Sequence, residues 1–312
     1  MFDTTRRRVL QSLGIGGTAA VAGCSAPAGE SPATETVEEN QAPQPQREDV
    51  ERVAADPADV PDPVDWSSPK HHEVEFTAKE VTAEIEPGVT FDFMTFDGRI
   101  PGPMVRVRRG DTISFTLHSD DGNSMPHNVD FHAVYGTGGG APATNVSPGE
   151  SNDVDFTAMY PGAYIYHCAV PNLDYHISSG MFGMILVEPE DGLPDVDREF
   201  YLGQHELYTD KDVGEEGHHG FDMQAMADED ATYVLFNGAK YPFVPDRYGR
   251  MAAETGERVR VYMVMGGPNY SSNFHPIGNV WTTAHRDGAL GTPEEYVQTM
   301  KGPPGSCMIG EM

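Results

Sequence analysis

Short apolar runs separated by turn-forming residues dominate the chain from about residue 71 onward. Val, Ile, Phe, Tyr and Thr recur in brief stretches, Gly, Pro, Asn and Asp stand between them, and no stretch sustains the 3.6-residue period of an amphipathic helix. Short strands at this spacing are typical of an all-β sandwich. The first half of the region is predicted to form strands at Glu73–Phe76, Phe91–Phe96, Met104–Val107, Thr112–Leu117, Asn152–Phe156, Gly162–His167 and Met181–Val187.

The second half of the chain repeats motifs of the first half in the same order. Matching motifs lie about 140 to 156 residues apart, as expected for one domain that occurs twice with small loop insertions. We therefore predict two tandem Greek-key β-sandwich domains, the first over residues 66–190 and the second over residues 191–312. The matched pairs are Thr95–Gly98 with Leu235–Gly238, Arg109–Ile113 with Thr255–Val259, His127–His132 with Asn273–Gly278, and Ser147–Gly149 with Pro303–Gly305.

The two copies differ after their shared Pro-Gly turn. Three predicted strands follow Pro148 in the first copy, whereas only eight residues follow Pro304 in the second. A sandwich without its last strands would leave sheet edges unpaired. The second domain is therefore expected to be incomplete, and the chain to be a fragment or a truncated product.

The first 65 residues lack the strand pattern. Residues 1–24 carry three consecutive arginines and then a short Gly- and Ala-rich apolar run, which is typical of a Tat-type export signal and too short to span a bilayer stably. The run ends in Val21–Cys24, which resembles a lipobox, so Cys24 is a candidate lipidation site. Residues 25–65 are rich in Pro, Ala and acidic residues and predict a disordered tether, with the folded part beginning near His71.

This N-terminus predicts export by the Tat route to the outer face of the cytoplasmic membrane or the extracytoplasmic space, with a lipid anchor as the membrane contact. The chain has 49 Asp and Glu against 20 Lys and Arg, only five of them Lys, and a formal net charge of -29. That balance argues against binding to nucleic acid or to an anionic lipid surface. It favours a halophilic protein, whose self-repulsion concentrated salt would screen, over an ordinary acidic secreted protein.

Two stretches of the first domain hold residues with metal-binding chemistry. One is His127–His132, and the other runs from Tyr166-His167-Cys168 through His176 to Met181. A thiolate, two imidazoles and a distant thioether form the ligand set of a blue-copper electron-transfer site. Cys168, His176, Met181 and one of the two early histidines are therefore candidate ligands of one metal.

Strand periodicity separates these residues into two groups. Neighbouring residues on a strand point to opposite faces, so His167 and Cys168 cannot bind the same metal. His127 and His132 are five residues apart and also face opposite sides if the segment is extended, whereas Asp130 shares a face with His132. The simplest arrangement has His127 with Cys168 at one metal and His132 with His167 at a second. The second site has open positions for a substrate, with Asp130 beside it as a proton donor or acceptor.

The motifs His127-x2-Asp130-x-His132 and Tyr166-His167-Cys168, with His176 and Met181 downstream, resemble those of copper-containing nitrite reductases over about residues 73–312, and the acidic composition favours a haloarchaeal type. The resemblance implies two cupredoxin domains, a homotrimer, and dissimilatory one-electron reduction of nitrite to nitric oxide at a type 2 copper fed by a type 1 copper. The implied site residues are His127, Cys168, His176 and Met181 for type 1 copper, His132 and His167 for type 2 copper, Asp130 and His275 for catalysis, and Ile277 for the nitrite pocket.

The resemblance also implies partners. Nitrite would be the substrate, and a small redox protein, such as a blue-copper protein, would be the electron donor. The third type 2 histidine of the family comes from the second domain of a neighbouring subunit, in a segment that this chain lacks. That ligand therefore has no residue assigned to it here.

Two other functions remain open from the residues alone. A blue-copper electron carrier would need only the type 1 ligands. A laccase-like multicopper oxidase would build a trinuclear cluster from His-x-His pairs, whereas this chain has His127-x4-His132 and no histidine directly after Cys168. Among the other residues, His205 is a structural histidine or has a role at the domain interface, and Cys307 is expected to be a small apolar residue.

Overall fold

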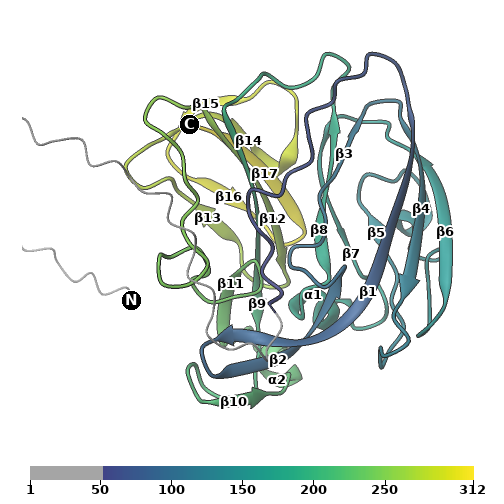
Figure 1. Ribbon diagram of the computed structural model, residues 1–312, viewed down its shortest axis with the longest axis vertical. Helices are drawn as coiled ribbons and strands as arrows, with labels where there is room; N and C mark the ends of the chain where they lie inside the picture. Colours follow the sequence, from purple (N-terminus) through teal and green to yellow (C-terminus); the bar gives the residue numbers. More distant parts are fainter. Residues whose placement is uncertain (1–51) are drawn as a thin grey trace, which may run out of the picture. The chain divides into compact units, whose positions relative to one another are not determined.

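The computed structural model describes residues 52–312, and strands make up most of its regular structure (Figure 1). The predicted export signal, the lipidation candidate Cys24 and most of the predicted tether lie outside the described residues. Within residues 52–312, no helix is both long and apolar enough to cross a membrane.

The first half of the described chain is a sandwich of two sheets, drawn in blue to teal in Figure 1. Its elements are β1 (His71–Glu86), β2 (Val89–Phe96), β3 (Val105–Arg108), β4 (Thr112–Ser119), β5 (Asp130–Phe131), β6 (Ser151–Thr157), β7 (Gly162–His167), α1 (Leu173–Ser178) and β8 (Phe182–Glu188). One sheet contains β2-β1-β4-β6 and the other has the order β3-β8-β7-β5. Aromatic side chains from both sheets meet in the core, where the Phe131 ring lies 4.9 Å from Phe115 and 5.3 Å from Tyr166.

The second half repeats the topology of the first sheet. Its elements are β9 (Arg198–Leu207), β10 (Gly217–His219), α2 (Met223–Ala227), β11 (Tyr233–Phe236), β12 (Val259–Gly267), β13 (Ser272–Phe274), β14 (Trp281–His285), β15 (Glu294–Val297), β16 (Met300–Gly302) and β17 (Ser306–Glu311). The order β11-β9-β12-β17 matches β2-β1-β4-β6, with a parallel central pair and antiparallel outer pairs in both. The predicted internal repeat is therefore present in the fold.

The repeat extends to the backbone conformation of a turn. Asp97-Gly98 follows β2 and Asn237-Gly238 follows β11, and all four residues have positive φ angles between 47° and 76°. Asp, Asn and Gly tolerate this left-handed conformation best, which explains why the two copies keep these residue types.

The second sheets of the two halves differ. Against the four strands β3-β8-β7-β5, the second half has only the pair β13-β16 within the described residues. The prediction of an all-β chain with two tandem cupredoxin domains is confirmed, and the described part of the second domain has the smaller second sheet.

The sheet of β7 and β8 is buried on both faces because it also packs against the second half. Ile185 and Val187 point into the first sandwich, while Phe182, Met184 and Leu186 pack against residues of β9, β12 and β17. All seven residues of β8 are buried, which accounts for its nearly continuous apolar sequence. The strand that follows Met181 is thus held between the two halves.

The folded part begins earlier than the sequence predicted. Val53 and Ala55 are buried, and both pair through their backbones with Ile100. The carbonyl of Pro57 accepts a hydrogen bond from the backbone N–H of Tyr201 in the second half. The prediction that the tether extends to residue 65 is therefore wrong for residues 53–57. A few small apolar residues there make enough contacts at the interface between the two halves to be ordered.

Candidate metal centre

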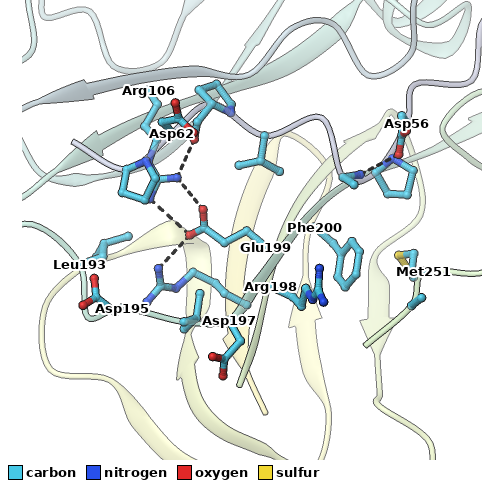
Figure 2. Close-up of a pocket in the computed structure, with 18 of the residues that line it drawn as sticks. Asp56, Asp62, Arg106, Leu193, Asp195, Asp197, Arg198, Glu199, Phe200 and Met251 are labelled. Atoms are coloured by element: carbon cyan, nitrogen blue, oxygen red, sulfur yellow. Dashed lines mark hydrogen bonds and ion pairs between the residues drawn. The ribbon is translucent and has the colours of Figure 1, made fainter. Parts of the chain in front are cut away.

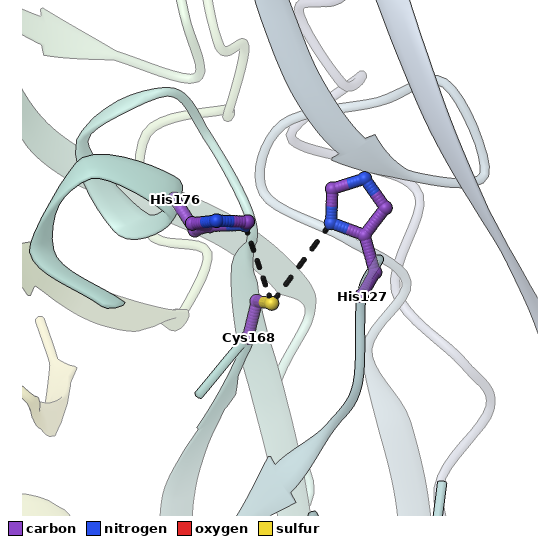
Figure 3. Close-up of side chains that lie close together, drawn as sticks. All are labelled: His127, Cys168 and His176. Carbon is purple, nitrogen blue, oxygen red and sulfur yellow. Dashed lines mark hydrogen bonds between the residues drawn. The ribbon is translucent and has the colours of Figure 1, made fainter. Parts of the chain in front are cut away.

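Three buried side chains come together at one end of the first sandwich (Figure 3). Cys168 directly follows β7, His176 lies in α1, and His127 lies in the segment that pairs with Val146 before β5. The Cys168 Sγ atom is 3.5 Å from His176 Nδ1 and 4.0 Å from His127 Nδ1. All three side chains are almost completely shielded from solvent. This arrangement can hold a metal ion through one sulfur and two nitrogen atoms.

Burial sets the protonation of this cluster. Burial, and secondarily the neighbouring His127, lower the pKa of His176 to about 4. Burial also lowers the pKa of His127, against the opposing effect of Glu80. Both imidazoles are therefore neutral near pH 7 and offer a lone pair. Burial raises the pKa of the Cys168 thiol to about 11, so a bound cation is needed to favour the thiolate.

Glu80 fixes the orientation of His127. Its carboxylate accepts a hydrogen bond from His127 Nε2–H at 3.2 Å, which leaves the lone pair on Nδ1 facing Cys168. The backbone N–H groups of Ser124 and Met125, and the Ser124 hydroxyl, donate to the same carboxylate. Burial opposes ionisation, but these hydrogen bonds together hold the pKa of Glu80 below its usual range.

Asn128 lies next to the Cys168 sulfur and fixes the backbone that follows it. Its Oδ1 atom accepts a hydrogen bond from Ala169 N–H at 2.7 Å and lies 3.8 Å from Cys168 Sγ. The sequence analysis identified neither Asn128 nor Glu80. Asn128 could have been suspected from its position beside a candidate ligand, whereas Glu80 lies on a distant strand and carried no sequence signal.

Met181 is buried and belongs to the same core cluster as Cys168. Its carbonyl accepts a hydrogen bond from Cys168 N–H at 3.1 Å, and its N–H donates to the carbonyl of His176 at 3.0 Å. The backbone of Met181 is thus tied to the two neighbouring candidate ligands. A thioether in this place suits a weak fourth ligand.

A second cluster contains Asp130, His132 and His167. Asp130 pairs with His167 across β5 and β7, and the Nε2 atoms of His132 and His167 are 3.1 Å apart. His167 Nδ1–H donates to the carbonyl of Cys168 at 3.0 Å, so the lone pair of His167 is on Nε2, which faces His132. Burial, and then the proximity of His167, lower the pKa of His132, while Asp130 opposes the change.

The structure places the two clusters as the strand periodicity predicted. His127 groups with Cys168, His132 groups with His167, and Asp130 lies with the second pair. His132 is exposed and Asp130 is half-buried, whereas the first cluster is closed to solvent. The second cluster can therefore admit a small ligand.

Two further residues near the second cluster were missed by the sequence analysis. Gly139 has a φ of +53°, and a Cβ atom there would lie 1.8 Å from Asp130 Oδ1, so glycine leaves room for that carboxylate. Asp287 of the second half is close enough to oppose the lowered pKa of His132. Neither residue belongs to a recognisable ligand motif.

A cavity of about 540 Å³ lies elsewhere, at the joint between the two halves (Figure 2). Glu199 lies beside Arg106 there and accepts hydrogen bonds from both Arg106 and Arg260. Other N–H groups of these two arginines donate to Glu188, Glu311 and backbone carbonyls. Most donors of both guanidinium groups are therefore bonded within the protein, and none of the cluster residues lines this cavity.

Known proteins resemble this chain over most of its length. The copper-containing nitrite reductase of Neisseria meningitidis serogroup B is 40% identical over 260 residues, which are 83% of this chain and 66% of that protein. The counterpart from serogroup A is also 40% identical, and 67% of it is covered. A solved copper nitrite reductase of Nitrosomonas europaea is 33% identical with a TM-score of 0.70, and the match covers 77% of this chain and 84% of that chain.

This chain belongs to the copper-containing nitrite reductase family. It spans about two thirds of the length of the curated nitrite reductases just described. The family described as multicopper oxidase also matches residues 77–192, and a solved multicopper oxidase is 26% identical with a TM-score of 0.65, over 78% of this chain and 79% of that chain. Nitrite reductases and these oxidases therefore share the sandwich fold, and the residues of the site must distinguish them.

Two residues expected in a nitrite reductase site do not join either cluster. His275 and Ile277 lie between β13 and β14 of the second half, and both are exposed. His275 Nδ1–H donates to the carbonyl of Gln298 at 2.6 Å, which leaves the ring's lone pair on Nε2. The Ile277 side chain is 92% exposed, so it makes little contact with the described residues of its own chain.

Proposed function

We propose that this chain contributes the metal-binding part of a dissimilatory nitrite reductase that forms nitric oxide. The observation that carries the proposal is the pair of clusters on either side of the His167–Cys168 bond, one closed and containing a thiol, the other open and containing a carboxylate. The reaction combines nitrite with two protons and one electron to give nitric oxide and water. It thus needs a route for electrons and a source of protons, and each cluster suits one of these needs.

Copper is the cofactor that fits these donor sets. His127, Cys168 and His176, with Met181 as the weak ligand, would hold type 1 copper, and His132 and His167 would hold type 2 copper. Two imidazoles, one thiol and a thioether are the donors that copper prefers for electron transfer. When bound, copper supplies one-electron redox chemistry at the first cluster and polarises a substrate oxygen at the second.

His167 and Cys168 join the two clusters. The residues are covalently bonded neighbours, and the hydrogen bond from His167 Nδ1–H to the Cys168 carbonyl provides a second connection. An electron accepted at the closed cluster from a small redox protein would have a short path to the open one. If the clusters were further apart, the electron would need other groups between them to carry it.

Asp130 is the candidate proton donor. It lies across β5 and β7 from His167, within reach of a ligand bound between His132 and His167. A carboxyl group in this place can hydrogen-bond to nitrite when protonated and pass its proton to the departing oxygen. The second proton would come through His275, if a neighbouring subunit supplies it.

A homotrimer would explain the exposed position of His275 and Ile277. Neither reaches a cluster within one chain, and both side chains are exposed and so accessible to another subunit. In such an assembly the second half of one subunit would cover the open cluster of the next, with Ile277 limiting the size of the substrate pocket. The third type 2 ligand would also come from the neighbour.

Copper content and nitrite binding test the proposal. The copper-loaded protein should hold two coppers per chain in the assembled enzyme, and nitrite should change the EPR signal of one of them. His167→Ala should remove the nitrite-sensitive signal and leave the type 1 colour. A single copper per chain without any nitrite effect would instead support a blue-copper electron carrier.

The oxidase alternative has less support from the site. The second cluster contains two histidines and one aspartate among residues 52–312, rather than the several His-x-His pairs of a trinuclear centre. Oxygen consumption with a phenolic reductant separates the two activities. Turnover of oxygen that exceeds turnover of nitrite would overturn our proposal.

Export, lipid anchoring and adaptation to salt are further parts of the proposal, and they rest on the sequence. The consecutive arginines and Cys24 support Tat export and lipidation, and the net charge of -29 supports a salt-rich environment. Mass spectrometry of the mature N-terminus tests for a lipid on Cys24. Unfolding at increasing KCl tests the second point, since a halophilic protein gains stability as its carboxylates are screened.

A further inference from the structure

His205 connects the second half of the chain to the segment that carries His176 and Met181. It lies on β9, its side chain is fully buried, and its Nδ1–H group donates to the carbonyl of Ser178 at 2.8 Å. The Ser178 hydroxyl donates in turn to the carbonyl of Glu206, also at 2.8 Å. Ser178 is the last residue of α1, the helix that contains His176. Two hydrogen bonds therefore attach the end of this helix to β9.

The other side of Met181 is fixed by packing. Phe182 follows Met181, and its ring lies 5.3 Å from the His205 ring. A Cβ atom at Gly203 would lie 3.0 Å from Phe182, and one at Gly266 would lie 2.9 Å from it. The ring thus lies against backbone of β9 and β12 that has no room for a side chain. Ser178 and Phe182, which bracket Met181, are both held by the second half.

The chemistry of the His205 ring supports a specific role. Burial lowers its pKa to about 4, so the ring is neutral near pH 7 with its proton on Nδ1. Its Nε2 atom is buried and has no hydrogen-bond partner among the described residues. A buried acceptor without a partner costs stability, which an apolar side chain of similar size would avoid. The bond to Ser178 is the one contribution of His205 that such a side chain could not replace.

We propose that His205 is a positioning residue for the type 1 copper ligands, because its hydrogen bond to Ser178 sets where Met181 and His176 lie relative to Cys168. This inference rests on the proposed copper site. A weak axial ligand tunes the reduction potential and the visible spectrum of such a site. The second half of the chain would thereby tune the metal that the first half binds, although it contributes no ligand to that metal.

Substitutions at His205 separate positioning from packing. His205→Leu has a similar volume and lacks the donor, whereas the amide nitrogen of His205→Asn can replace Nδ1. In the copper-loaded protein, His205→Leu should change the ratio of the two Cys-to-copper absorption bands and shift the reduction potential. His205→Asn should return both toward the wild-type values.

His219→Leu is the matched control. His219 is also a buried histidine of the second half, with Nδ1 bonded to Thr209 and Nε2 bonded to the carbonyl of Glu215, and neither partner belongs to the ligand segment. The variant His219→Leu should lower the melting temperature without changing the absorption bands. If His205→Leu does not fold, His205→Phe, which also lacks the donor and keeps an aromatic ring beside Phe182, should change the band ratio in its place.

The outcomes are distinguishable. A wild-type protein without a type 1 spectrum would overturn the proposed copper site, and this inference with it. A normal wild-type spectrum that persists unchanged in His205→Leu would overturn the role of His205 alone. An equal spectral change in His219→Leu would show general loosening of the second half and would also overturn it.

Discussion

The closed cluster contains Cys168 and the open cluster contains its neighbour His167, yet the two clusters differ in their surroundings. His127, Cys168 and His176 are buried. Glu80 accepts a hydrogen bond from His127, and Asn128 accepts one from Ala169 N–H, next to Cys168. The open cluster has an exposed His132, a half-buried Asp130 and no carboxylate that orients His132 among the hydrogen bonds of the described residues. The closed cluster is therefore arranged within one chain, whereas the open one has sides that another subunit or a substrate can fill.

This difference follows from what each cluster is proposed to do. An electron-transfer metal changes its charge with little movement, so rigid, dry surroundings suit it. A catalytic metal must exchange ligands, so an open coordination position is required. The single peptide link between His167 and Cys168 allows both conditions to exist at neighbouring positions of the chain.

The largest effect is expected from Cys168→Ser. Without the thiolate the type 1 colour should disappear, and nitrite reduction with a protein donor should fall by well over the ~100-fold that loss of an outer partner causes. Nitrite should still perturb the EPR signal of the open cluster. Absorption and EPR spectra of the copper-loaded variant check this, and loss of both signals would mean that the clusters are not independent.

Asp130→Asn is expected to slow nitrite turnover by roughly 10² to 10⁴-fold, the usual contribution of a general acid. The amide keeps the shape of the side chain and cannot deliver a proton. Steady-state kinetics with nitrite measure the effect, and the type 1 spectrum serves as the control. A loss of colour would show that Asp130 supports the closed cluster rather than the open one.

Glu80→Gln should act on the closed cluster alone. The amide cannot accept all the hydrogen bonds that the carboxylate receives from Ser124, Met125 and His127, so His127 becomes less well oriented. The affinity for type 1 copper should fall by about 10 to 100-fold, as for other partners of metal ligands. Competition with a copper chelator measures this. A nitrite-sensitive site that weakens equally would contradict the separation of the clusters.

The smallest effect concerns acid stability of the metal-free protein. Because burial and His127 lower the pKa of His176 from 6.5 to about 4, the unfolded chain takes up a proton between these values that the folded chain does not. Stability should therefore fall as the pH decreases, by at most roughly 2 kcal/mol between pH 7 and 5 for this group. Urea unfolding of wild type and His176→Leu measures it, and an identical pH dependence in both would refute the assignment.

Much of this molecule was predictable from its sequence. The alternation of short apolar runs with turn residues predicted the strands, and the repeated turn at Asp97-Gly98 and Asn237-Gly238 predicted two copies of one fold. The odd and even spacing of His127, Asp130, His132 and the His167-Cys168 pair predicted two clusters, because a strand alternates its faces at every residue. These are local properties, fixed by spacing along the chain.

Other features were decided only by contacts between distant segments. Glu80 meets His127 across 47 positions, and His205 reaches Ser178 across 27. Val53 and Ala55 are ordered because they pack at the interface between the two halves, which forms only when both are folded. The sequence by itself determined which residues could bind metal and on which face each would lie, since these depend on chemistry and strand period. The tertiary structure alone decided which other residues, such as Glu80 and His205, position the metal-binding residues. Hydrogen bonds and packing between remote strands follow from the fold and not from the spacing of residues.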